Sequence, residues 1–167
     1  VALSGAGPVT PGRSGSLPLK PIIEMRFAGD YPVEAMMGVV TGQGGVQADL
    51  GTNAMVKVEM MIKAGDEFAA LIMDAMAWQV SKEIGAMFAA LEGRCDAIIL
   101  TGGLAYSTRF TGCIKQRTGL IAPVKIYPGE DERLALALGA LRVLRGQEPA
   151  IEYCERITAR RARILSM

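Results

Sequence analysis

The sequence predicts an α/β fold in which helices pack on a short, mainly parallel sheet. An unbroken apolar run at 97–100 has the length of a strand, and Thr101-Gly102-Gly103 stops it just before a segment that can begin a helix. A second strand-like run at 122–127 is likewise followed by a helical pattern. Because the first run is apolar at consecutive positions, we expect a strand that helices cover on both faces.

The first forty residues predict a loop followed by two short helices. Residues 1–17 are rich in Gly, Pro and Ser and show neither a helical nor a strand period. The pattern turns helical at Pro18, with a short amphipathic helix that ends at Gly29 and a second helix at 31–40.

A glycine cluster at 41–45 then breaks the helical pattern. It lacks the Lys-Ser/Thr pair of a phosphate-binding P-loop and follows no strand, so a helix end and a loop are favoured over a phosphate cradle. Residues 46–50 are expected to be extended. Thr52 or Asn53 can then cap a helix at 55–63, whose apolar residues lie on one face.

Three more helices are expected further along the chain. Asp66 caps a long one that reaches about Leu91, with its methionines and Trp78 in the core. The others lie at 106–118 and 130–144. Pro149 can start a short last helix before a basic tail at 154–167.

Composition limits the classes of function. The chain has 167 residues, half of them hydrophobic, and a net charge of +1, which argues for one domain and against a nucleic-acid or anionic-membrane partner. It has no histidine, the usual general base and zinc ligand. Its apolar runs are shorter than a membrane span, and three widely spaced cysteines (Cys95, Cys113 and Cys154) fit a reducing cytoplasm. Because it begins at Val1, we expect a fragment.

Two positions carry chemistry of their own, each with a structural alternative. Gly102 and Gly103 either form a tight turn between strand and helix or let the backbone approach a flat or anionic ligand. Arg13 either sits in water, as loop arginines commonly do, or directs its planar guanidinium at a phosphate or carboxylate.

An acidic turn offers a third candidate. Glu130, Asp131 and Glu132 either complement the dipole of the helix that they open or hold Mg²⁺ through their oxygen atoms.

Several segments together resemble the C-terminal half of butyrate kinase, a relative of acetate kinase in the actin-like ATPase superfamily. They are ALSGAGPVTPGRSGSLP near the start, LGTN at 50–53, LTGGLAYSTRF at 100–110 and the long segment from IAPVKIYPGEDE to AIEY. The resemblance covers about residues 2–153. It implies an incomplete second domain of the ribonuclease-H-like fold at 1–153, with the tail 154–167 outside it.

The resemblance implies a kinase that moves the γ-phosphoryl group of ATP to a short-chain carboxylate such as butyrate, giving an acyl phosphate and ADP, or the reverse. Such transfer needs mainly stabilisation of charge on the transferring group. Arg13 matches the catalytic arginine loop of the family. The nucleotide site is matched by two groups of residues: Gly51, Thr52 and Asn53, and Gly102, Gly103 and Ser107.

The metal is assigned by the same resemblance. Asp131 or Glu132 would hold Mg²⁺, and Glu132 is preferred. The expected partners are a small carboxylate, the amino-terminal half of the kinase and further copies of the chain, in the cytoplasm; the chain alone should be inactive.

Two departures from the family pattern leave other interpretations open. The amino-terminal domain and the first strands of the second domain are absent from the sequence, and the family's Asp-x-Arg after LGTN, which holds ribose and adenine, is Ala54-Met55-Val56. A degenerate or truncated remnant that acts only as an assembly module is one alternative. Another is a sugar kinase of the same superfamily, which should share the strand-to-glycine turn but not RSG at 13–15 together with PGEDE at 128–132.

Overall fold

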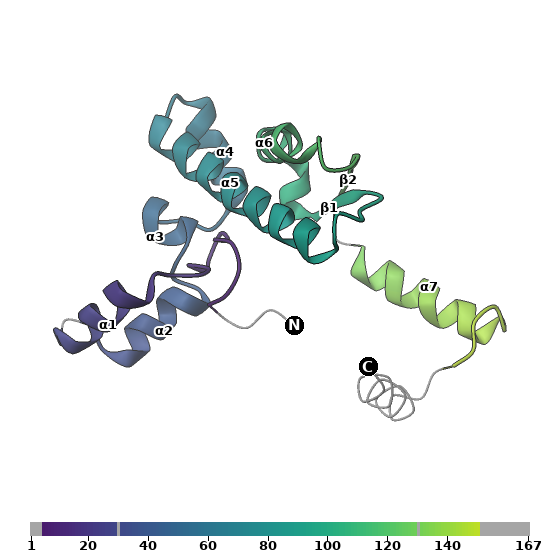
Figure 1. Ribbon diagram of the computed structural model, residues 1–167, viewed down its shortest axis with the longest axis horizontal. Helices are drawn as coiled ribbons and strands as arrows, with labels where there is room; N and C mark the ends of the chain where they lie inside the picture. Colours follow the sequence, from purple (N-terminus) through teal and green to yellow (C-terminus); the bar gives the residue numbers. More distant parts are fainter. Residues whose placement is uncertain (1–4, 30, 130, 151–167) are drawn as a thin grey trace. The chain divides into compact units, whose positions relative to one another are not determined.

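The computed structural model describes residues 5–29, 31–129 and 131–150 (Figure 1). It divides into two units, one up to Gly129 and one from residue 130 onward, and each is described by itself. Glu130, Cys154 and the predicted tail at 154–167 lie outside the described residues.

The first unit begins with a loop and two short helices, as predicted. Helix α1 spans Leu19–Phe27 and helix α2 spans Val33–Thr41. Pro18 and Pro32 occupy the N-cap positions, where a fixed φ angle and a missing N–H group cost the helix nothing. No residue of either helix is buried within the described structure.

The expectation of an extended segment at 46–50 is wrong. Helix α3 (Val46–Leu50) is a single turn that Gly45 starts and Gly51 ends, the latter with a φ angle of 68° and an N–H bond to the Gln47 carbonyl oxygen. Val46 is only 1% exposed, so packing fixes this turn. Five residues are too few to separate a helical period from a strand period.

Helices α4 (Met55–Lys63) and α5 (Glu67–Ala90) agree with prediction in their bounds. Asp66 caps α5 by accepting a hydrogen bond from the Ala69 N–H at 2.9 Å. Capping of α4 by Thr52 or Asn53 is wrong: the N-cap residue is Ala54, and the Thr52 hydroxyl accepts the Ala54 N–H at 3.2 Å instead. The hydroxyl therefore tightens the linker before the helix.

The sheet consists of two parallel strands, β1 (Ile98–Gly102) and β2 (Val124–Pro128), with Ile98 opposite Val124. A 3₁₀ turn, η1 (Gly103–Tyr106), and helix α6 (Thr108–Thr118) connect them. The predicted helix at 106–118 thus starts two residues late, because η1 takes up the first turn. The parallel sheet itself is confirmed.

One face of β1 is open, contrary to the expectation of helices on both faces. Ile98 is 8% exposed whereas its neighbour Ile99 is 62% exposed. Neighbouring residues of a strand point to opposite faces, so the described residues cover one side of this sheet only.

The core of the first unit lies where α3, α4, α5 and α6 meet. Its largest fully buried side chains are Val46, Val58, Met73, Met76 and Ile114. Burial of Trp78 in this core was predicted and is wrong: its side chain is 49% exposed on α5, with the Lys82 ammonium 4.6 Å from the ring centre. The methionines at 73 and 76 fill the core in its place.

The second unit contains helix α7 (Glu132–Leu144), the helix predicted at 130–144. None of its residues is buried within the described structure, and Leu134, Leu136 and Leu144 are more than half exposed. No helix among the described residues is both long and apolar enough to cross a membrane.

Candidate functional site

The turn after β1 requires glycine at Gly102. Its φ angle is 87°, a conformation that side chains rarely adopt. Its N–H donates to the Gly129 carbonyl oxygen at 3.1 Å, and its own carbonyl accepts the Gly129 N–H at 3.2 Å. Both main-chain groups of Gly102 are therefore engaged within the fold, and Gly103 begins the 3₁₀ turn that follows.

Ser107, predicted to contact nucleotide, is buried beneath this turn. Its hydroxyl oxygen accepts the Phe110 N–H at 3.2 Å and lies 3.8 Å from the Met73 sulfur, and the residue is 6% exposed. It is the N-cap of α6. Ser107 thus fixes the start of this helix.

A cleft of about 380 Å³ opens beside the turn, a volume within the usual range for small-molecule sites. Side chains of α4, α5, η1 and α6 line it: Glu59, Ile62, Lys63, Met73, Tyr106, Thr108 and Arg109. Of the predicted nucleotide-site residues, none is in this lining, although Tyr106 and Thr108 directly flank Ser107. Sequence analysis missed the charged residues of the cleft.

Arg109 is held in the cleft by a bidentate ion pair with Asp74 of α5. Its Nε donates to one carboxylate oxygen at 2.9 Å and its terminal nitrogen to the other at 2.6 Å. The hydrogen bond from Arg109 lowers the pKa of Asp74 from its usual value, and burial partly opposes this effect. The Cys113 thiol lies 3.5 Å from the same carboxylate. The pair ties α6 to α5.

The second predicted wall of the nucleotide site, Gly51-Thr52-Asn53, forms the link between α3 and α4. Gly51 and Asn53 are exposed, and Thr52 is half-buried. Side chains of α4 line the cleft together with Tyr106, whereas residues 51–53 do not line it.

Arg13 projects from a loop that main-chain hydrogen bonds close on itself. The Thr10 N–H donates to the Arg13 carbonyl oxygen at 3.0 Å, and the Arg13 N–H donates to the Thr10 hydroxyl at 3.0 Å. The Val9 N–H donates to the Gln79 side-chain oxygen on α5 at 2.9 Å, which joins the loop to the core helix. Arg13 itself is exposed, and none of the hydrogen bonds or ion pairs found among the described residues uses its guanidinium.

The glycine cluster after α2 packs against this loop. The Gly44 N–H donates to the Gly12 carbonyl oxygen at 3.1 Å. A Cβ atom on Gly44 would lie 2.0 Å from the Val39 carbonyl oxygen, and one on Gly45 would lie 2.0 Å from that of Thr10. These glycines let the two chain segments come into contact, and the cluster forms a loop as predicted. The contact supports the backbone of the Arg13 loop.

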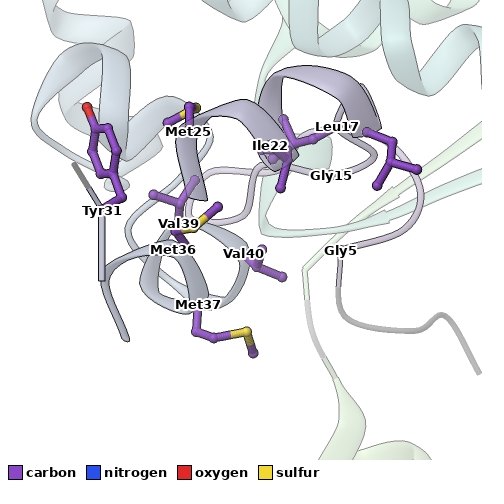
Figure 2. Close-up of a pocket in the computed structure, with 11 residues that line it drawn as sticks. Gly5, Gly15, Leu17, Ile22, Met25, Tyr31, Met36, Met37, Val39 and Val40 are labelled. Carbon is purple, nitrogen blue, oxygen red and sulfur yellow. The ribbon is translucent and has the colours of Figure 1, made fainter. Parts of the chain in front are cut away.

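An apolar pocket of about 360 Å³ lies between this loop and the helices α1 and α2. Figure 2 shows Ile22 and Met25 of α1 near Met36 and Val39 of α2, with Tyr31 where one helix passes to the next. Gly15, two residues beyond Arg13, forms part of its wall. The pocket has no charged side chain in its lining.

Asp131 and Glu132, the predicted metal ligands, stand at the start of α7 in the second unit. Both are exposed, and Asp131 makes no side-chain capping bond to the helix. Among the described residues, no cluster of three or more His, Cys, Asp or Glu side chains could hold a metal. Two adjacent exposed carboxylates still fit Mg²⁺, which takes one or two protein carboxylates and completes its shell with water and phosphate.

Comparison with known protein families gives a match over residues 6–112, more than half of the chain, to the acetokinase family. The chain belongs to the acetokinase family. The match includes the Arg13 loop, the cleft and the glycine turn. This acetokinase assignment confirms the predicted relationship at the level of the family; butyrate kinase within it stays a prediction.

Solved structures of related fold agree. Acetate kinase from Porphyromonas gingivalis matches 83% of this chain with a TM-score of 0.71 and 19% identity, and acetate kinase from Entamoeba histolytica matches 81% with a TM-score of 0.67 and 16% identity. A propionate kinase from Francisella tularensis subsp. tularensis SCHU S4 matches 69% with a TM-score of 0.61 and 22% identity.

In each case this acetokinase-family chain spans less than half of the matched structure, namely 41%, 43% and 30% of its length. The likeness confirms the predicted fold, an incomplete domain of the actin-like ATPase type.

Proposed function

We propose that this chain supplies the nucleotide-side half of a kinase that transfers a phosphoryl group between ATP and a short-chain carboxylate such as butyrate. Its membership of the acetokinase family is the observation that carries the proposal. The names of the solved relatives, acetate kinase and propionate kinase, support a small carboxylate as substrate. An amino-terminal half of the kinase, and further copies of this chain, would be its partners.

Arg13 is the residue to which we assign the catalytic role. Its loop is fixed by hydrogen bonds at Thr10, Gly12 and Ser14, while its guanidinium extends from an exposed residue. A rigid backbone with an available planar cation suits a group that must meet charge on the phosphoryl oxygens as that charge spreads in the transition state. Positioning and charge stabilisation are most of what phosphoryl transfer requires.

The turn at Gly102 and Gly103 and the cleft beside it are the proposed binding site for the nucleotide. Gly102 and Gly103 begin the turn whose last residue, Tyr106, lines the cleft, and Ser107 caps the helix α6 that follows. Asp131 or Glu132 would hold Mg²⁺, which neutralises charge on phosphate oxygens when it is bound. The contacts of Gly51, Thr52 and Asn53 with nucleotide remain part of the proposal.

A second candidate is a non-catalytic remnant that acts as an assembly module. One observation favours it: Ile99 on β1 and the leucines of α7 are exposed within the described structure, as surfaces that seek a partner would be. The two candidates differ in whether the chain contributes to turnover.

Trapping of acyl phosphate with hydroxylamine tests the proposal. A longer protein that joins this chain to an amino-terminal half should form hydroxamate from butyrate, ATP and Mg²⁺ but not from glucose, and the chain alone should form none. Arg13→Lys should lower kcat by roughly a hundredfold or more and leave the KM for nucleotide nearly unchanged, because the lost contact forms mainly in the transition state.

Arg94→Lys is the matched control, since Arg94 is also exposed and, within the part of the chain that the structure describes, pairs with the nearby Glu92 alone. Normal turnover of the Arg13→Lys protein would remove Arg13 from the mechanism. Absence of hydroxamate with every carboxylate would favour the assembly module.

A further inference from the structure

Helix α5 carries an apolar stripe that stays exposed within the described structure. Phe68 and Leu71 are more than half exposed, and Trp78 is nearly so. Three alanines further along the same line of the helix are exposed as well. We call the following residues the outer stripe of α5: Phe68, Leu71, Ala75, Trp78, Ala86 and Ala89.

The spacing of these residues places them on one side of the helix. With Lys82 between Trp78 and Ala86, successive positions are three or four residues apart, as in the seam of a coiled coil. At 3.6 residues per turn they fall within an arc of about 80°. This arc lies opposite the buried Met73 and Ala77, which face the core. An exposed apolar stripe on the side away from the core is typical of a surface that packs against another helix.

We propose that the outer stripe of α5 is an interface between two copies of this chain, whose α5 helices lie antiparallel with Leu71 of each copy against Ala86 of the other. This inference rests on the proposed function in one respect, because it names the surface through which the further copies expected there would bind.

The sizes of the side chains select the antiparallel register. The first half of the stripe carries the bulky Phe68 and Leu71, and its last two members are alanines. An antiparallel pair centred between residues 78 and 79 places Phe68 against Ala89 and Leu71 against Ala86, so each large side chain meets a small one. The same centre is the midpoint of α5 (Glu67–Ala90), so the two helices overlap along their whole length, about 36 Å at 1.5 Å per residue.

A parallel pair fits less well. It would set Phe68 against Phe68, leave a gap between the alanines, and bring two Lys82 ammonium groups together. In the antiparallel pair Lys82 faces Ala75 instead, and the two Trp78 rings lie beside each other near the two-fold axis, where aromatic rings can stack with an offset. Opposed helix directions also place the positive end of one helix dipole beside the negative end of the other.

This pattern is the reason to assign a second copy as the occupant of the stripe. A two-fold dimer needs one surface that is complementary to itself, so that residue i contacts residue j and j contacts i. The outer stripe of α5 meets this requirement with its own large and small side chains. A different protein surface would have no need of such a match.

Disulfide cross-linking between copies tests the inference. A mixture of Leu71→Cys and Ala86→Cys chains should form a disulfide-linked dimer under mild oxidation, whereas neither variant alone should exceed the wild-type background. In the antiparallel register the two copies of position 71 lie about 22 Å apart along the helices, far beyond the roughly 7 Å between Cα atoms that a disulfide tolerates. Ala75→Cys mixed with Lys82→Cys is a second pair in the same register, so a folding defect in one variant does not decide the outcome.

Leu71→Cys mixed with Met87→Cys is the matched control. Met87 adjoins Ala86 and is exposed, but its side chain lies about 100° further round the helix. This mixture should therefore stay at the wild-type level. A disulfide between two Leu71→Cys chains would indicate a parallel pair, and no disulfide in either test mixture would mean that copies do not meet at this stripe. Either result overturns the inference.

The same cross-link is also measured in a longer protein that joins this chain to an amino-terminal half of the kinase. It should form there too. A disulfide that forms in the chain alone and is lost in the longer protein would mean that the other half of the kinase covers the stripe, which also overturns the inference. Because the cross-link is measured without turnover, absence of hydroxamate would count against the proposed kinase and leave the result for the interface unchanged.

Discussion

Replacing Gly45 by alanine should destabilise the fold around the Arg13 loop more than alanine at Gly42 or Gly51 does. Gly45 has a φ angle of 60° and a ψ angle of −143°, a region that only glycine occupies readily. An added Cβ atom would also lie 2.0 Å from the Thr10 carbonyl oxygen and 2.7 Å from that of Arg13. Both atoms are main chain, so relief requires a shift of the backbone.

The other two glycines separate these effects. Gly51 has a φ angle of 68° but no atom within 4 Å of an added Cβ, and Gly42 has an extended φ angle of −170° and equally open surroundings. Strain at a backbone conformation that side chains rarely adopt costs about 1–3 kcal/mol. We therefore expect Gly42→Ala to change the free energy of unfolding by less than about 1 kcal/mol, Gly51→Ala to lower it by about 1 kcal/mol, and Gly45→Ala to lower it by about 3 kcal/mol or more.

Urea denaturation followed by circular dichroism measures the three values, provided that the slope with urea stays constant across the variants. A Gly45→Ala protein as stable as Gly51→Ala would refute the reasoning, because it would mean that the loop moves aside at no cost. In that case the Arg13 backbone is not held by the glycine cluster.

Two further predictions concern charge and surface. Arg109 lowers the pKa of Asp74, so the pair contributes stability above the ordinary aspartate pKa of about 4, and this stability is lost as the pH falls through the lowered value. The urea midpoints of wild type and Asp74→Asn should therefore differ at about pH 6, and the difference should shrink as the pH is lowered past the ordinary aspartate value. A constant difference across this range would contradict it. The open face and unpaired edge of β1 should make the chain self-associate, and Ile99→Lys should shift its sedimentation toward monomer; a monodisperse wild-type monomer would be evidence against this expectation.

The sequence predicts those elements whose signals are local. The apolar run at 97–100 ending in glycine is sufficient to place β1, and Asp66 before a long helical pattern marks the start of α5. The prediction of an extended segment at 46–50 is wrong because its helical turn depends on the burial of Val46 and on the backbone conformation of Gly45. Both are consequences of packing. The prediction that Trp78 is buried is wrong for a similar reason. The sequence of α5 is apolar on nearly all sides, so it does not indicate which face of the helix other elements cover.

The residues of the candidate site likewise divide into those that the sequence indicates and those that only packing brings together. Arg13 and the glycine turn could be singled out because loop and turn residues interrupt regular patterns. Glu59 and Arg109 could not, since they are fifty positions apart and each resembles an ordinary solvent-facing residue of a helix. Only the packing of α4 and α6 against α5 places them on one cleft.

Trp78 is the only tryptophan of the sequence, so its fluorescence is an intrinsic probe of the association of this chain with other proteins. Its half-exposed ring lies on α5 under the Lys82 ammonium and outside the lining of the cleft. Its fluorescence should therefore shift to shorter wavelength when another protein surface covers this side of α5, and should change little when a nucleotide enters the cleft. A single intrinsic probe thus distinguishes assembly from ligand binding without any label.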